Sequence, residues 1–327
     1  MLLSQLLKKL ALSVTMIVST WAAAQTYPDK SISMVVAYPA GGASDFVARL
    51  ISKEMAMNLS QTITVENVSG AAGGIGVTKV INATPDGYTL LLGSPLESIL
   101  TPLALSAMKY KPQDLKLAAL LGRTSVMLLV RKDLAANNLD EFVELAKKNK
   151  GKPLSYCTPG IGSLYHLMAE KFTLMTNAST LHVPYSGLAP CVTALISSQI
   201  DFAFMPIAGA VPGFVNSRTM RALAVTSTVP SARLPSLPLM KNTKGFEDFV
   251  FNVWAGVQVG AKVSDAVVAI INKSAIAASA HPDTRKSLMA TGAEPAEPMS
   301  PAETAAFYSK EIQTYQAIAK SINLQQQ

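Results

Sequence analysis

Apolar runs that end at glycine-rich loops and lead into helical segments are the feature that most constrains this chain. Residues 31–38 form an apolar run that predicts a buried parallel strand. A loop at residues 39–42 ends this run, and apolar residues at helical spacing follow as far as residue 59. The same order recurs over residues 63–83 and 154–174. The repetition of strand, loop and helix indicates an α/β fold with a sheet rich in parallel strands.

The chain is also predicted to divide into two lobes. Its strand and helix pattern changes character near Arg123 and again near Thr226. The simplest interpretation is a discontinuous first lobe, residues 25–123 plus 228–327, with a second lobe at residues 124–227 inserted into it. Two crossings between lobes form a hinge, and a cleft at a hinge is a common ligand site. We therefore expect a ligand cleft between the lobes.

Residues 1–24 have the pattern of a secretory signal peptide. Lys8 and Lys9 precede an apolar run at residues 10–21, and Ala22-Ala23-Ala24 resembles a cleavage site. The run is short for a bilayer span. A membrane anchor or a buried helix is the alternative interpretation. We expect the signal peptide to be removed and the mature chain to be periplasmic and soluble.

The charge pattern argues against a nucleic-acid partner. The formal charge is +7, and removal of Lys8 and Lys9 leaves +5. The basic residues do not form a block, so no nucleic-acid surface is predicted. A mild positive excess instead favours a small anionic ligand. With 49% hydrophobic and only 15% charged residues, the chain is expected to be a well-packed globular protein.

The cysteines and histidines show no pattern that is typical of a metal site. Cys157 and Cys191 would pair in an oxidising compartment, but two separate buried thiols fit the sequence equally well. The three histidines and these cysteines lack metal-ligand spacing. No nucleophile motif or supported carboxylate pair is present either. We expect no metal, no cofactor and no catalytic residue.

Three glycine-rich loops, at residues 39–45, 70–76 and 158–163, each precede a helical segment. A helix N-terminus exposes unpaired N–H groups, and glycine lets a ligand approach them, so such a loop binds an anion without a basic side chain. The alternative is a tight turn in which Asp45 only caps a helix. The second loop departs from the dinucleotide and P-loop patterns, which leaves a backbone amide site.

Several motifs in one order resemble a known family. They are Tyr27-Pro28-Asp29-Lys30, Pro39-Ala40-Gly41-Gly42, Val65-Glu66-Asn67, Pro85-Asp86-Gly87-Tyr88, His182-Val183-Pro184-Tyr185 and Arg221-Ala222-Leu223-Ala224. From about residue 27 to 315 the chain resembles the Bug/TctC family, the solute-binding receptors of tripartite tricarboxylate transporters. The resemblance implies a type II-like, two-lobed periplasmic binding protein fold. Each lobe would be a mixed sheet flanked by helices, with the ligand cleft between them.

The resemblance also implies where the ligand binds. One ligand carboxylate would be held by the loops at residues 39–42 and 72–74. The second lobe would close over it with residues 158–163, 182–185 and 204–206. For His166 and Trp254, internal packing is the alternative role. The candidate ligand-binding residues are Tyr38, Pro39, Ala40, Gly41, Gly42, Ser44, Asp45, Ala72, Gly73, Gly74, Ser94, Thr158, Gly162, Ser163, His166, Tyr185, Met205, Pro206 and Trp254.

One departure from the family bears on the ligand. Many members have an Asp-Asn pair where this chain has Met205-Pro206. Methionine cannot pair with an ammonium group, so we predict a carboxylate without an α-amino group, apolar, aromatic or dicarboxylic. The alternative is that Met205 belongs to the core.

The sequence leaves three candidate functions. The leading one is a monomeric transport receptor that delivers its ligand to membrane permease subunits. The second is a sensory receptor that signals to a membrane sensor kinase, and the sequence does not separate these two. The third is an exported enzyme, which the lack of a catalytic constellation disfavours.

Overall fold

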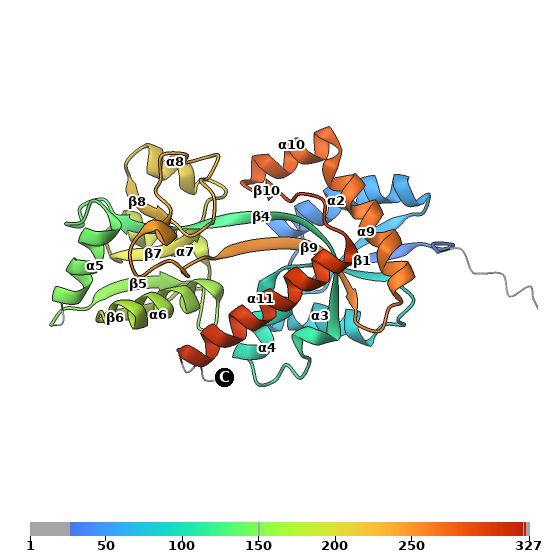
Figure 1. Cartoon of the computed structure of the whole chain (residues 1–327), viewed down its shortest axis with the longest axis horizontal. Helices are drawn as coiled ribbons and strands as arrows, with labels where there is room; N and C mark the ends of the chain where they lie inside the picture. The colour runs from blue at the N-terminus through green and yellow to red at the C-terminus, as the bar shows by residue number, and fades with distance from the viewer. Residues whose placement is uncertain (1–26, 150, 323, 325–327) are drawn as a thin grey trace, which may run out of the picture.

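The computed structural model describes residues 27–149, 151–322 and 324, so the predicted signal peptide at residues 1–24 lies outside the described residues. The chain forms two lobes, and each is a mixed sheet flanked by helices, as predicted (Figure 1). The first lobe lies at the right of Figure 1 and the second at the left.

In the first lobe, β1 is the central parallel strand. It pairs in parallel with β2 and β3, whereas β9 runs antiparallel to both β3 and β4, and β10 pairs antiparallel with β4. Helices α2 and α9 cover one face of this sheet and α3 packs on the other. The bounds are β1 Ile32–Val36, α2 Ala43–Leu59, β2 Ile63–Asn67, α3 Gly74–Asn82, β3 Thr89–Gly93, β9 Asn252–Gly260, α9 Asp265–Ala280, α10 Pro282–Thr291 and β10 Glu294–Pro295.

In the second lobe, β5 is parallel to β6 and β7, while β4 is antiparallel to β7 and β8. Helix α5 is capped by Asn138, whose side-chain oxygen accepts a hydrogen bond from the backbone N–H of Glu141 at 2.9 Å. The bounds are α5 Leu139–Lys148, β5 Leu154–Thr158, α6 Leu164–Thr176, β6 Thr180–Pro184, α7 Leu188–Ile196, β7 Phe202–Pro206, α8 Val211–Asn216 and β8 Met220–Val225.

Strand β4 (Leu115–Arg131) joins the two lobes because it belongs to both sheets. Its residues 115–125 pair with β9, and its residues 126–131 pair with β7 and β8 (Figure 1). The change in pattern near Arg123 is not a break in the strand, because Gly122 and Arg123 both pair with β9. The strand continues there with a shift in register between Leu120 and Gly122, which adds a residue without ending the pairing. The predicted limits of the lobes stay a proposal.

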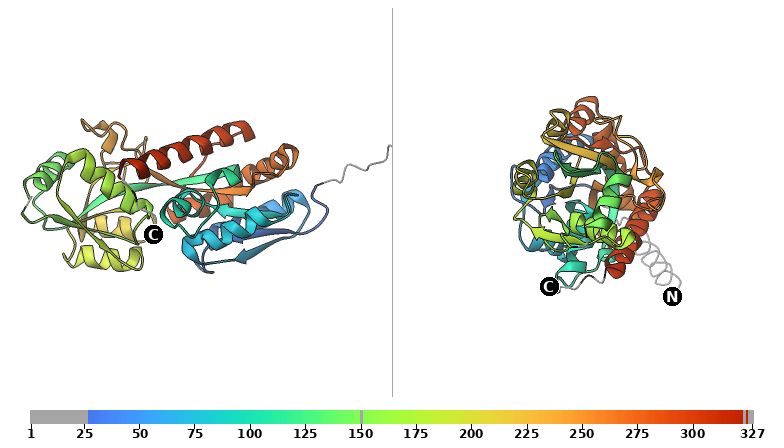
Figure 2. Two further views of the ribbon diagram at one scale, coloured as in Figure 1. Left: turned by 90° about the horizontal axis from the view of Figure 1, so that it is seen from below. Right: turned by 90° about the vertical axis from the view of Figure 1, so that its left-hand side faces the viewer.

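Helix α11 (Pro301–Ser321) packs along β4 and reaches α6 of the second lobe, as Figure 2 shows from the side. It starts with a capping box formed by Ser300 and Glu303. Its buried residues Tyr308, Ile312 and Tyr315 share one apolar core with residues of both lobes. The remaining short turns are η2 Ala71–Gly73, η3 Leu96–Leu100, α4 Thr101–Ala104, η4 Pro112–Asp114 and η5 Met240–Asn242.

Candidate functional site

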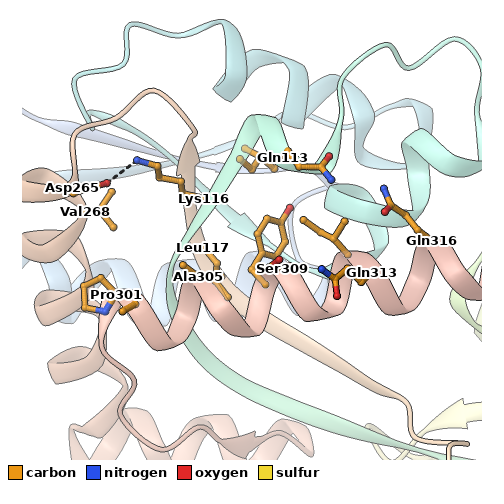
Figure 3. Close-up of a pocket in the computed structure, with 14 residues that line it drawn as sticks. Gln113, Lys116, Leu117, Asp265, Val268, Pro301, Ala305, Ser309, Gln313 and Gln316 are labelled. Carbon is orange, nitrogen blue, oxygen red and sulfur yellow. Dashed lines mark hydrogen bonds and ion pairs between the residues drawn. The ribbon is translucent and has the colours of Figure 1, made fainter.

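A cavity of about 290 Å³ lies between the two lobes and is the candidate ligand site. Strand ends and α2 of the first lobe form most of its wall, and the second lobe contributes Tyr165, Leu188, Pro206 and Ala208. A larger cavity of about 740 Å³ runs along α11 (Figure 3). Residues of β4, α9 and α11 line this larger cavity, and Lys116 and Asp265, which form an ion pair, are among them. We favour the smaller cavity because both lobes enclose it.

The cavity between the lobes is mainly apolar with a set of hydroxyl groups. Among the residues that line it, all of which the structure describes, no side chain is charged. A bound anion would therefore be held by dipoles and hydrogen bonds and not by a basic side chain. The lining hydroxyls belong to Tyr38, Ser44, Ser94, Thr124, Tyr165 and Thr291.

The first glycine loop brings the N-terminus of α2 to this cavity. Gly42 is the N-cap and has no side-chain cap, and Ala43 and Ser44 of the first turn line the cavity. Neither of their backbone N–H groups donates a hydrogen bond within the part of the chain that the structure describes. Unpaired N–H groups at a helix start attract an anion. The loop residues Pro39, Ala40, Gly41 and Gly42 themselves are exposed and lie outside the cavity wall.

Asp45 holds this loop and is not among the residues that line the cavity, so its predicted role in ligand binding stays a prediction. Its buried carboxylate accepts hydrogen bonds from the backbone N–H of Gly41 at 2.9 Å, from Arg49 Nε at 3.0 Å and from Asn67 Nδ2 at 3.0 Å. These partners occupy both carboxylate oxygens. The Arg49 guanidinium, with the Gly41 N–H, lowers the pKa of Asp45 to about 2.

We expect the stability of the protein to fall in acid partly through Asp45. The pKa of this carboxyl is about 2 in the folded state against 3.8 for an unperturbed group, so its stabilising effect is present above about pH 4. It is lost as the pH falls from about 4 towards 2. Urea unfolding at a series of pH values should therefore show the wild type and Asp45→Asn converging below pH 4. A difference that stays constant down to pH 2 would contradict this role.

The second glycine loop packs against η3 and α4, which follow the cavity-lining residue Ser94. Ala72 and Gly73 have positive φ values of 52° and 91°, and Thr101 Oγ1 donates to the Ala72 carbonyl at 2.9 Å. A Cβ atom on Gly73 would lie 2.6 Å from Cβ of Glu97, so only glycine fits against η3 there. Ala72, Gly73 and Gly74 do not line the cavity. The prediction that they contact the ligand is not reproduced by this geometry.

Glu97 lies directly behind the cavity wall and was missed by the sequence analysis. It is 1% exposed. Its carboxylate accepts hydrogen bonds from Tyr38 Oη at 3.0 Å, from Ser94 Oγ at 2.6 Å and from the backbone N–H of Ser94. Burial raises the pKa of Glu97. Tyr38 and Ser94, both predicted site residues, do line the cavity.

The third glycine loop, at residues 158–163, is held by histidines of the second lobe. The backbone N–H of Gly162 donates to His166 Nδ1 at 3.1 Å, and Thr158 Oγ1 lies 2.7 Å from His182 Nε2. The two imidazoles stack with their centroids 4.4 Å apart. Burial lowers the pKa of both, that of His182 to about 4. Both rings are therefore neutral near pH 7.

None of Thr158, Gly162, Ser163, His166 and Tyr185 lines the cavity. Ser163 instead caps α6, where its Oγ accepts a hydrogen bond from the backbone N–H of His166. Tyr185 packs against the apolar core of the second lobe. The helix turns Tyr165, the neighbour of His166, towards the cavity, and no sequence pattern distinguished this residue.

The third loop touches the first lobe instead. A Cβ atom on Gly162 would lie 2.4 Å from Cβ of Ala104 in α4. Glycine therefore allows this close contact between the lobes, and the φ of Gly162, +77°, also favours glycine.

The pair Met205-Pro206 divides between core and cavity. Met205 is fully buried in the core that holds Met127 and Cys157 and does not line the cavity, which fits the alternative that it belongs to the core. Pro206 lines the cavity. Successive strand residues point to opposite faces, which explains the difference. The prediction that the ligand lacks an α-amino group depended on Met205 and loses its basis.

Trp254 both lines the cavity and packs internally. It is 1% exposed, and its indole N–H donates to Glu311 Oε2 of α11 at 3.0 Å. Cys157 and Cys191 form a disulfide between β5 and α7, with their Cα atoms 5.7 Å apart.

Across the described residues, no group of three or more His, Cys, Asp and Glu side chains could hold a metal ion. None of the helices that the structure describes is long and apolar enough to cross a membrane.

Two mixed sheets that share strand β4, with a cavity between them, define a two-lobed periplasmic binding protein. The chain belongs to the TctC family, described as the tripartite tricarboxylate transporter family receptor, whose model matches residues 47–324. Protein BugT of Bordetella pertussis is 30% identical over 301 residues, which cover 91% of this chain and 90% of BugT.

Two solved structures of similar proteins contain bound acids. MatC of Rhodopseudomonas palustris with bound malate is 26% identical, with a TM-score of 0.73 over 89% of this chain and 99% of MatC. A second R. palustris protein, with adipate, is 26% identical, with a TM-score of 0.75 over 91% of this chain and 98% of its own.

Proposed function

We propose that this protein captures a small carboxylate in the cavity between its lobes and delivers it to the membrane permease subunits of a tripartite transporter. The observation that carries this proposal is a cavity enclosed by both lobes, with hydroxyl groups and the open N-terminus of α2 in its wall. Such a wall suits an anion of small size. Relatives that bind malate and adipate support the same ligand class.

We further propose that the chain acts in the periplasm as a monomer, after removal of residues 1–24. The signal-peptide pattern and the membership of a family of periplasmic receptors support this location. The protein is proposed to release its ligand unchanged. Recovery of the bound acid intact by mass spectrometry tests this, and a chemically altered product would establish an enzyme instead.

A thermal-shift screen of the mature chain against small carboxylates tests ligand capture. A ligand that binds only the native state stabilises it, and at 100 times Kd the rise in Tm is about 5 °C for a chain of this size. Malate, adipate and aromatic monocarboxylates are suitable probes, with the matching neutral amides as controls. The proposal fails if no carboxylate raises Tm more than its amide does.

Ala43→Pro tests whether the N-terminus of α2 holds the carboxylate. Proline at the first helical position removes one unpaired N–H and is well tolerated there, and Gly42 already has the extended conformation that precedes proline. We expect affinity for a bound carboxylate to fall about tenfold, since a hydrogen bond to a charged group is lost. Calorimetry gives the affinity, and urea unfolding should be unchanged. Ala43→Ser, which keeps the N–H, is the matched control, and equal affinity in both variants would exclude this anion site.

The permease as partner is tested in cells. Deletion of the gene should abolish uptake of the labelled ligand while ligand-induced gene expression persists. The reverse pattern would assign the protein to a sensor kinase.

A further inference from the structure

The hydrogen bonds of Glu97 determine which groups the cavity offers to a ligand. Tyr38 Oη donates to Glu97 Oε2 at 3.0 Å, and Ser94 Oγ donates to the same atom at 2.6 Å. In the ionised form of Glu97, which the Ser94 backbone N–H and these two hydroxyls stabilise against the effect of burial, the carboxylate receives the single hydrogen of each hydroxyl. Toward the cavity, Tyr38 and Ser94 therefore present oxygen lone pairs and act as acceptors. Ser94 Oγ also accepts from the backbone N–H of Leu96 at 3.2 Å, which leaves it one lone pair.

Other hydroxyls of the cavity are not committed in this way. Ser44, Thr124 and Tyr165 line it, and their hydroxyls donate no hydrogen bond to the protein within the described residues, so they can donate to a carboxylate. Ser44 lies at the N-terminus of α2 and Tyr165 on the second lobe. The cavity wall thus has a donor region, which suits an anion, and an acceptor region over Glu97, which does not.

The negative charge of Glu97 is not neutralised by a basic side chain among the described residues. Its carboxylate is fully buried, and no basic side chain forms an ion pair with it in the part of the chain that the structure describes. A ligand carboxylate placed against Tyr38 and Ser94 would face two acceptor oxygens, with the Glu97 carboxylate behind them, and would be repelled. A hydrogen-bond donor would satisfy the same two oxygens.

We propose that Glu97 is a positioning residue that turns the Tyr38 and Ser94 hydroxyls into acceptors, so that the cavity selects acids bearing a hydroxyl or amino donor near the carboxylate. This inference rests on the proposed capture of a carboxylate and adds the polar group that accompanies it. A hydroxyl and an ammonium group both donate hydrogen bonds, and the experiment below distinguishes between them.

The test measures Kd by calorimetry for matched acids on the wild type. The pairs are malate with succinate and mandelate with phenylacetate, each differing by one hydroxyl, and aspartate replaces the hydroxyl of malate with an ammonium group. Within a pair, the donor-bearing acid should bind about 5- to 10-fold more tightly, the effect of one additional hydrogen bond. Equal affinities in every pair would overturn the inference and leave carboxylate capture standing. Failure of all five acids to bind would overturn both.

Glu97→Gln then tests the positioning role without a change in side-chain size. One amide group of glutamine donates, so it cannot accept from both hydroxyls and the Ser94 N–H together. When the amide oxygen keeps the hydrogen bond from the Ser94 N–H, the NH2 group faces both hydroxyls, which then turn their hydrogens toward the cavity. The affinity ratio within a pair should then fall to about one or reverse. A purely structural role would weaken both acids of a pair equally and leave the ratio unchanged, which would refute the proposal.

Two further variants keep the test decisive if Glu97→Gln does not fold. Tyr38→Phe removes one acceptor and should also lower the ratio within a pair. Tyr110→Phe is the matched control because the Tyr110 hydroxyl donates to the backbone carbonyl of Glu97 and not to its carboxylate. The ratio should persist in Tyr110→Phe. A ratio that persists in Tyr38→Phe as well would overturn the assignment.

Discussion

The double variant Cys157→Ala with Cys191→Ala is expected to lose about 3–4 kcal/mol of unfolding free energy. The disulfide closes a loop with a sequence separation of 34, and in the chain-entropy model a loop of this length restricts the unfolded chain by that amount. It joins β5 to α7 in the core of the second lobe. Urea unfolding of the oxidised wild type and the variant measures the difference.

Reduction of the wild type separates the covalent link from packing. Both sulfur atoms are buried, so alanine also leaves unfilled space. Reduced wild-type protein retains the sulfur volume but not the bond. Its midpoint in urea should lie between those of the oxidised protein and the variant. Equal midpoints for reduced and oxidised wild type would show that the link does not stabilise the native state.

The strands were predictable from the sequence because their apolar runs are short and end at turn residues. The run at residues 31–38 contains β1, and the segments predicted at residues 63–83 and 154–174 begin with β2 and β5. Helix α10 was not predicted, because it is mostly polar and buries only Thr284 and Leu288. Without an apolar face, no helical period is visible. Its start at Pro282 and its end at Gly292 were the available signals.

The candidate site was predictable as a set of loops but not as a set of contacts. Glycines mark where the backbone can approach another group, yet they do not say whether that group is a ligand or protein. Gly73 approaches Glu97 and Gly162 approaches Ala104, and neither lines the cavity. In a strand or a helix, a shift of one position along the chain decides whether a side chain points to the cavity or away from it. Pro206 lines the cavity where Met205 does not, and Tyr165 lines it where His166 does not.

Glu97 could not have been found by its residue type. A glutamate between Leu96 and Ser98 usually indicates an exposed helical position, and only the fold brings Tyr38 to it from 59 positions earlier. The polarity of the cavity wall therefore depends on a contact between Tyr38, which follows β1, and Glu97 of η3, and this contact has no local signature. Tyr38 and Ser94 could be predicted as site residues from the sequence, but the direction of their hydrogen bonds could not.

Gly292 is a second point where glycine permits contact between the lobes. It follows α10 with a φ of +96°, and a Cβ atom there would lie 2.4 Å from the backbone oxygen of Ile207 and 2.9 Å from Cα of Ala208. Both neighbours are backbone atoms of the second lobe, so no side-chain rotation relieves the overlap. Ala208 and the residues on either side of Gly292 line the cavity.

Gly292→Ala is therefore expected to raise the Kd of any bound carboxylate about tenfold or more, because the two walls of the cavity must separate. Alanine at positive φ also costs about 1–2 kcal/mol of stability by itself. Gly245→Ala is the matched control, since Gly245 has a φ of +87° and no atom within 4 Å of its added Cβ. Calorimetry should show weaker binding only in Gly292→Ala, while urea unfolding shows a loss of stability in both. Equal affinities in the two variants would mean that this contact between the lobes does not shape the ligand-bound state.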